Sequence, residues 1–190
     1  MDKKINIVNI GVSGHRFLDD TILLRNSILE VLKKIYSRHN HSKFNIISPL
    51  AVGADQLVAE CGLEHPAVSL TVLLPMPLKD YLKEFSASEK IKFMCLFNKR
   101  EKLIQLHGSE KKDEAYLKMG TFLLDSIDYL IGLWNGKPTR GIGGTAQVSK
   151  LARERHLPTA WIRAHNAIPG EAIPLDWQLE PGSIEYENWI

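Results

Sequence analysis

A short segment near the start of the chain carries residue types suited to binding a phosphate group. It reads GVSGHR and begins at Gly11. Gly11 and Gly14 let the backbone approach a ligand closely, the Ser13 hydroxyl can donate a hydrogen bond, and the Arg16 guanidinium offers a planar fork for phosphate oxygens. The segment could instead be a plain tight turn with Arg16 solvated and His15 capping backbone groups. As a ligand site, it would bind a phosphate or a ribose.

A second segment of this kind, SPLAVGAD, begins at Ser48. Gly53 allows a sharp entry into a helix that starts near Ala54, and Asp55 then lies in the first helical turn. Aspartate is common there because its carboxylate accepts hydrogen bonds from free amides and faces the positive end of the helix dipole. Asp55 therefore either caps its helix or holds a ribose hydroxyl or the edge of a base. Ser48, Gly53 and Ala54 are candidates for the same binding surface.

A third segment is rich in glycine and contains Gly143, Gly144 and Thr145 in the run GIGGT. A glycine-rich turn that opens a helix suits a phosphate, and Thr145 could donate its hydroxyl from the start of that helix. The run lacks the G-K-[ST] of the P-loop, which disfavours Mg²⁺-dependent hydrolysis of nucleoside triphosphates. Trp134, at the end of the preceding strand-like segment, could stack on a base or belong to the core.

A fourth segment supplies apolar surface. Pro75 lies in the run LPMP, and Tyr81 and Phe85 follow it. A phenol and an aromatic ring near the same crevice could enclose a purine, although core packing explains Phe85 equally well.

Strand-like and helix-like patterns alternate along the chain, and together they predict the scaffold that would hold these four segments. The apolar residues of 18–36 recur every three or four positions, as in an amphipathic helix. Further helices are expected from residue 53, from about residue 79 and over 144–156. The predicted strands are 5–10, 44–47, 68–74, 103–106, 129–134 and, as the last, 159–162. This order predicts an α/β, Rossmann-like, doubly wound and mainly parallel sheet, with ligands at the carboxyl ends of its strands.

Length and composition indicate one domain, over residues 1–164, followed by a proline-containing tail over 165–190 that lies on the domain or on a partner. The net charge of +2 is too small to favour binding of long nucleic acids. No apolar run is long enough to span a membrane, and Cys61 and Cys95 have no neighbours at metal-ligand spacing. We therefore expect a cytoplasmic protein with neither metal nor membrane contact, and a homo-oligomer.

Taken together, GVSGHR, SPLAVGADQLVAE and GIGGTAQVSKLA resemble, in order and spacing, the three loops of the SLOG superfamily. This superfamily is named for the Smf/DNA-processing protein A group and the lonely-guy phosphoribohydrolases. The resemblance covers roughly residues 5–162. It implies a Rossmann-like domain that binds a nucleotide or nucleotide-derived ligand, as members in bacterial conflict systems are thought to do when they sense or process such signals.

The resemblance also bears on catalysis. Lonely-guy enzymes carry P-G-G-x-G-T-x-x-E, and the position of that glutamate is Val148 here; nucleoside deoxyribosyltransferases place a glutamate nearby, where this chain has Gln147 and Val148. Of the carboxylates that could substitute, only Asp55 is well placed. The leading hypothesis is thus a sensor or carrier that binds a nucleotide-derived small molecule, with no certain cofactor. The alternative is a hydrolase of an N-glycosidic or phosphate bond that uses Asp55 with His15 or Arg16.

Overall fold

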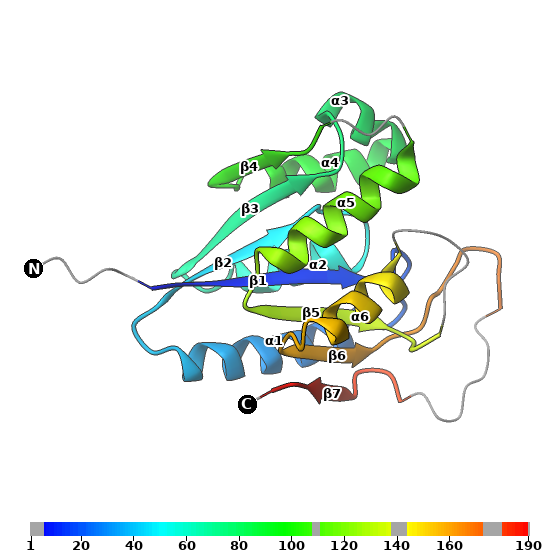
Figure 1. Cartoon of the computed structure of the whole chain (residues 1–190). Helices are drawn as coiled ribbons and strands as arrows, with labels where there is room; N and C mark the ends of the chain where they lie inside the picture. Colours follow the sequence, from blue (N-terminus) through cyan, green and yellow to red (C-terminus); the bar gives the residue numbers. More distant parts are fainter. Residues whose placement is uncertain (1–5, 108–110, 138–143, 173–179, 190) are drawn as a thin grey trace, which may run out of the picture.

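The computed structural model describes residues 6–107, 111–137, 144–172 and 180–189, and one sheet runs through all of it. The strand order is β4-β3-β2-β1-β5-β6-β7 (Figure 1). All neighbours pair in parallel except β6 and β7, which are antiparallel. The strands are β1 (Ile7–Gly14), β2 (Lys43–Ser48), β3 (Val68–Leu74), β4 (Lys102–Gln105), β5 (Tyr129–Trp134), β6 (Thr159–Arg163) and β7 (Ile184–Glu187).

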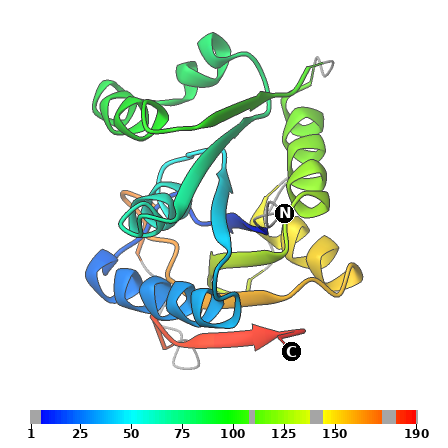
Figure 2. The same ribbon diagram turned by 90° about the vertical axis from the view of Figure 1, so that its left-hand side faces the viewer.

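Helices cover both faces of the sheet (Figure 2). One face carries α1 (Thr21–Arg38), α2 (Ala54–Gly62) and α4 (Ala87–Phe97), and the other carries α5 (Lys112–Asp125) and α6 (Thr145–Glu154). The short α3 (Leu78–Tyr81) and the 3₁₀ helix η1 (Leu82–Glu84) follow β3. The predicted α/β, Rossmann-like, doubly wound fold is confirmed. Among the described residues, no helix has the length and apolarity needed to cross a membrane.

The core has two parts because strand side chains alternate between the two faces. Val8, Ile10 and Val12 of β1 pack with the buried side of α1 and α2, whereas Leu130 of β5 packs with α5 and α6. Every residue of β5 is buried, as expected for a parallel strand covered by helices on both sides. The sheet is therefore a rigid platform whose carboxyl ends can hold loops in fixed positions.

The end predicted for the first strand is wrong. We expected the strand to stop at Ile10 and Gly11 to begin a turn, but β1 continues to Gly14. Gly11 pairs in register with Ile47 and Leu130 on either side, and a Cβ at this position would lie 2.4 Å from Cδ1 of Ile127. A glycine inside a strand often marks such a close approach. Gly11 thus makes room for side chains above the sheet, shortly before the candidate site begins.

The prediction that residues 159–162 form the last strand is also wrong, because β7 follows in the tail. This strand extends the sheet beyond β6, and the Arg153 guanidinium of α6 donates to both carboxylate oxygens of Glu187 at 2.7–3.1 Å. The Trp189 ring then packs on Tyr129, with centroids 5.1 Å apart. Part of the tail therefore belongs to the same sheet, while residues 173–179 lie outside the described ranges.

Candidate functional site

A cavity of about 240 Å³ opens at the carboxyl edge of the sheet, beside β1 and the start of α6. The strands β1 to β4 succeed one another toward one edge of the sheet, whereas β5 lies on the opposite side of β1. The strands up to β4 therefore extend the sheet in one direction, and those from β5 on extend it in the other. The topological switch point lies between the neighbouring strands β1 and β5. In open α/β sheets, ligands bind in the crevice at this switch point, where the loops on either side diverge. The walls come from the end of β1, the start of α2, η1, α5 and the start of α6.

The first wall is the end of β1. Ser13, Gly14 and Arg16 line the cavity. A Cβ on Gly14 would lie 2.4 Å from the Cβ of Ala54 and 2.7 Å from the carbonyl oxygen of Leu133, so a glycine is needed where α2 crosses β1. The Arg16 side chain is 43% exposed, and its Nη1 lies 3.9 Å from the carboxylate of Glu84. Its Nη2 also donates to the Glu84 carbonyl oxygen at 3.4 Å, so the guanidinium is held beside η1, and its exposed side faces the cavity mouth.

The structure places His15 behind this wall and not in it. Its backbone N–H donates to Leu133 O at 3.0 Å, and its carbonyl accepts from Ala54 N–H at 3.1 Å. The backbone N–H of Asn135 donates to its Nε2 at 3.1 Å, which requires this nitrogen to be unprotonated. Burial lowers the pKa of His15 and so favours the neutral ring that this bond needs. His15 therefore links two loops, the one that contains Arg16 and the one that follows β5.

The second wall contains Asp55, which is 7% exposed and lines the cavity from the first turn of α2. Its Oδ2 accepts a hydrogen bond from the backbone N–H of Ala51 at 3.2 Å. Burial raises the pKa of this carboxyl to about 7, although the Ala51 bond and the charge of Arg16 both act to lower it. Near neutral pH, the side chain can therefore either donate or accept a proton.

The other residues predicted in this segment shape the turn without lining the cavity. The Ser48 hydroxyl accepts from Leu50 N–H at 3.0 Å and donates to Asp55 O at 3.4 Å, and Ser48 is fully buried. Gly53 has φ +88°, and a Cβ there would lie 2.4 Å from the carbonyl oxygens of both His15 and Arg16. Ala54 packs beneath Gly14. The turn thus holds the first two walls against each other.

The third wall is the N-terminus of α6. Gly144 is its N-cap and so offers no side chain to cap the helix, and Thr145 and Val148 also line the cavity. Because the first amides of a helix lack intrahelical partners and lie at the positive end of its dipole, this terminus suits an anion. Gly143 lies outside the described residues.

Trp134 and Pro75 are buried at the ends of β5 and β3 and are not part of the cavity wall. The Trp134 indole N–H donates to Lys137 O at 3.0 Å, and its ring packs on Trp161 with centroids 5.6 Å apart. Of the two alternatives that we left open for Trp134, the structure shows packing in the core.

The fourth wall holds residues that the sequence analysis missed. Glu84 of η1 is 14% exposed, and its carboxylate lies 2.9 Å from Lys112 Nζ. The phenol of Tyr116 donates to the same carboxylate at 2.7 Å. Lys112 and Tyr116 are four residues apart and so share one face of α5. That spacing was visible in the sequence, but nothing there indicated that the face would meet η1.

The site therefore combines two cations, two carboxyl groups and the phenols of Tyr81 and Tyr116 around an apolar floor. Arg16, Lys112 and the α6 terminus can attract a negatively charged group, and the carboxyl groups can bind hydroxyl or amine donors. No group of three or more His, Cys, Asp or Glu side chains that could hold a metal occurs among the described residues. Within that part of the chain, the chemistry suits an organic anion.

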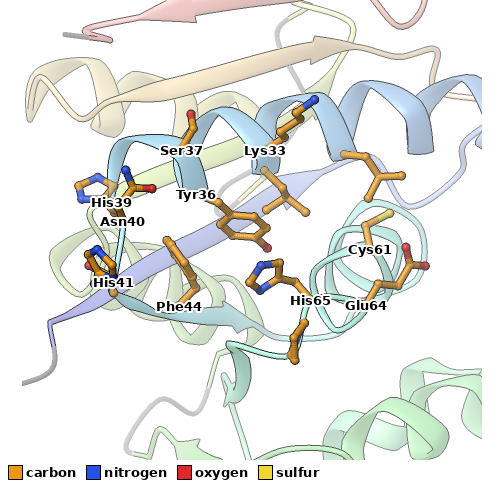
Figure 3. Close-up of a pocket in the computed structure, with 14 residues that line it drawn as sticks. Lys33, Tyr36, Ser37, His39, Asn40, His41, Phe44, Cys61, Glu64 and His65 are labelled. Atoms are coloured by element: carbon orange, nitrogen blue, oxygen red, sulfur yellow. The ribbon is translucent and has the colours of Figure 1, made fainter.

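A larger and more open hollow, of about 660 Å³, lies at the opposite edge, where α1 ends and β2 begins (Figure 3). The Tyr36 ring lies between those of Phe44 and His65, with centroid distances of 4.4 and 4.6 Å. Burial raises the pKa of Cys61 to about 11, which keeps this thiol protonated and unreactive. The backbone N–H of Ala67 donates to His65 Nδ1 at 3.2 Å. None of the four candidate segments reaches this hollow. A third hollow, of about 620 Å³, is lined by residues of only the first two of these segments, among them Arg16 and Gly53. The carboxyl-edge cavity is the candidate site because residues of all four segments line it.

Comparison with known proteins adds fold-level likenesses only. No family model and no curated protein matches the chain. The structural-genomics target TM1055 matches with 14% identity and a TM-score of 0.49, over 80% of this chain and 72% of that one. The Moco carrier protein from Chlamydomonas reinhardtii matches with 17% identity and a TM-score of 0.45, over 81% and 75%. Since both TM-scores are below 0.5 and both identities are low, these likenesses assign neither a ligand nor a reaction to this chain.

Proposed function

We propose that the carboxyl-edge cavity binds a nucleotide or nucleotide-derived phosphate ligand, and that the protein acts as a sensor or carrier of that ligand. One observation carries the proposal: the end of β1, with Ser13 and Arg16, and the start of α6, with Gly144 and Thr145, line the same cavity at the switch point of the sheet. The sequence resemblance to the SLOG superfamily supports the same class of ligand.

In this proposal, the phosphate lies at the N-terminus of α6. It would accept hydrogen bonds from the first amides of the helix and from the hydroxyls of Ser13 and Thr145, and Arg16 would neutralise its charge from the cavity mouth. The cavity is smaller than the roughly 300–1,000 Å³ typical of sites for drug-sized ligands. A sugar phosphate fills such a space, and the base would project outward past Arg16.

The phosphate assignment is tested by titrating AMP and adenosine into the protein by isothermal titration calorimetry. We expect AMP to bind at least about tenfold more tightly than adenosine, because each charge-assisted hydrogen bond contributes about 1.5–3 kcal/mol. Arg16→Ala should weaken AMP binding by about 10- to 100-fold by the same reasoning. Arg155→Ala is the matched control, because Arg155 pairs with Asp125 beyond the C-terminus of α6. Equal affinity for AMP and adenosine would refute the phosphate assignment.

Hydrolysis of the bound ligand is a second candidate function, and one observation favours it. A buried carboxyl whose pKa lies near 7 is suited to general acid or base catalysis at neutral pH. The test is to incubate the protein with NAD, cyclic ADP-ribose, AMP and CMP and to analyse the mixtures by liquid chromatography and mass spectrometry. Catalysis would be established by products that the unmodified protein forms and Asp55→Asn does not. These are a free base with ribose phosphate or ADP-ribose for N-glycosidic cleavage, and a nucleoside with inorganic phosphate for cleavage of a phosphate bond. Compounds that all survive intact would leave binding as the function.

A further inference from the structure

Tyr81, at the end of α3, has a hydroxyl group that its own fold does not use. The residue is 1% exposed, and its ring packs on Phe85 and Phe93 with centroid distances of 5.2 and 5.9 Å. Its hydroxyl has no hydrogen-bond partner among the described residues. A phenylalanine would make the same ring contacts without burying a polar atom, and a buried hydroxyl without a partner is destabilising. The phenol is thus unexplained by packing.

The same residue is part of the wall of the candidate cavity. Tyr81 lines it together with Asp55, Glu84 and Tyr116. Burial is the main cause that raises the pKa of the Tyr81 phenol, and the charges of Tyr116, Asp55 and Glu84, which share the cavity wall with it, raise it further. The Tyr116 phenol already donates to Glu84, and Asp55 already accepts from Ala51. Each carboxyl can accept further hydrogen bonds, whereas Tyr81 can still donate one.

We infer that this end of the cavity recognises the vicinal hydroxyls of a ribose, so that the ligand is a ribonucleotide or ribose phosphate and not its 2-deoxy counterpart. The inference rests on the proposed function and specifies the sugar of its ligand. A hydroxyl group both accepts and donates, so one ribose oxygen can accept from Tyr81 while its proton is donated to Asp55 or Glu84.

Other ligand groups fit this end of the cavity less well. A phosphate group would compete with the Glu84 carboxylate for Arg16 and Lys112, and when fully ionised it has no proton to donate to that carboxylate. An apolar group would leave the Tyr81 hydroxyl buried without a partner, at the cost of its desolvation. The arrangement therefore orients a sugar phosphate, with its phosphate at the N-terminus of α6 and its hydroxyls toward η1.

The experiment compares ribose 5-phosphate with 2-deoxyribose 5-phosphate by calorimetric titration of three proteins. These are the unmodified chain, Tyr81→Phe, and Tyr36→Phe as a matched control. Tyr36 also carries a buried phenol without a hydrogen-bond partner among the described residues, but it lines the hollow at the opposite edge of the sheet. Thermal unfolding of each variant shows whether its fold is intact, and we expect no loss of stability in Tyr81→Phe because the ring contacts remain.

We expect the unmodified chain to prefer the ribose compound by about tenfold or more, as a site built around a ligand hydroxyl does. Tyr81→Phe should lose most of this preference by binding ribose 5-phosphate more weakly, and Tyr36→Phe should keep it. If the unmodified chain binds both sugars equally, or if Tyr81→Phe keeps the preference, the inference is wrong and the proposed function stands. If the unmodified chain binds neither sugar phosphate and does not bind AMP, this inference and the proposed function are both wrong.

Discussion

The difference in stability between the unmodified chain and Asp55→Asn should depend strongly on pH. An unfolded chain releases the Asp55 proton near the ordinary aspartate pKa of 3.8, whereas burial in the folded state raises that pKa to about 7. Between these values, the folded state binds more protons, so rising pH destabilises it. The difference between these two pKa values corresponds to a loss of up to about 4 kcal/mol in the free energy of unfolding as the pH rises. The asparagine variant, which is neutral throughout, should escape this loss.

The measurement is urea unfolding of both proteins at pH 5 and pH 8, between which about 3 kcal/mol of this loss should occur. Histidines of the unfolded chain also titrate in this range, but they are present in both proteins, and their contribution cancels in the difference. Asp80→Asn is the control, because the Asp80 side chain is 47% exposed and its bond to Lys83 lowers its pKa, so it is ionised at both pH values. If Asp55→Asn has the same pH dependence as the unmodified chain, Asp55 does not have the raised pKa on which the catalytic alternative depends.

Gly53→Ala should be the most damaging small substitution in the site. Gly53 has φ +88° and ψ −120°, a conformation that residues with a Cβ rarely adopt, at a cost of about 1–3 kcal/mol. The new Cβ would also lie 2.4 Å from two backbone carbonyl oxygens, those of His15 and Arg16. Because backbone atoms cannot rotate away as a side chain can, overpacking adds about 1–3 kcal/mol. We expect a loss of about 3 kcal/mol or more in the free energy of unfolding.

Comparison with a second glycine, Gly170, separates the effect of backbone strain from that of the steric clash. Gly170 has φ +83°, but a Cβ at Gly170 would meet no atom of a described residue within 4 Å. Gly170→Ala should therefore cost only the backbone strain, and Gly53→Ala should cost clearly more. Gly53→Ala should also weaken AMP binding, since any relief of the clash displaces the loop that carries Arg16. Equal stability losses in the two variants would show that the contact between this turn and the β1 loop is not tight.

The sequence predicted the fold well where buried segments are continuous. The runs 68–74 and 129–134 were predicted with the bounds that β3 and β5 have, because strands covered on both faces are apolar throughout. The end of β1 was missed because Gly11 resembles a turn residue, although its role is close packing under Ile127. The β7 strand was missed because its four residues gain their order from pairing with β6, which a local pattern does not reveal.

The candidate site was predictable only in part, for a related reason. Ser13, Arg16, Asp55 and Thr145 meet in one cavity because each follows a parallel strand or lies at its end, and all such ends share one edge of the sheet. Glu84 could not be found in this way. Its η1 helix and the Lys112 side of α5 meet only in the folded chain.

A crystal structure of the protein soaked with AMP would show whether the carboxyl-edge cavity binds a phosphate-bearing nucleotide ligand. We predict that the AMP phosphate lies at the N-terminus of α6, within hydrogen-bond distance of Ser13 or Thr145 and beside Arg16, with the ribose toward Tyr81. AMP found in the hollow around Tyr36, or in the cavity with its phosphate against Glu84, would show that the cavity does not recognise a nucleotide in the way proposed.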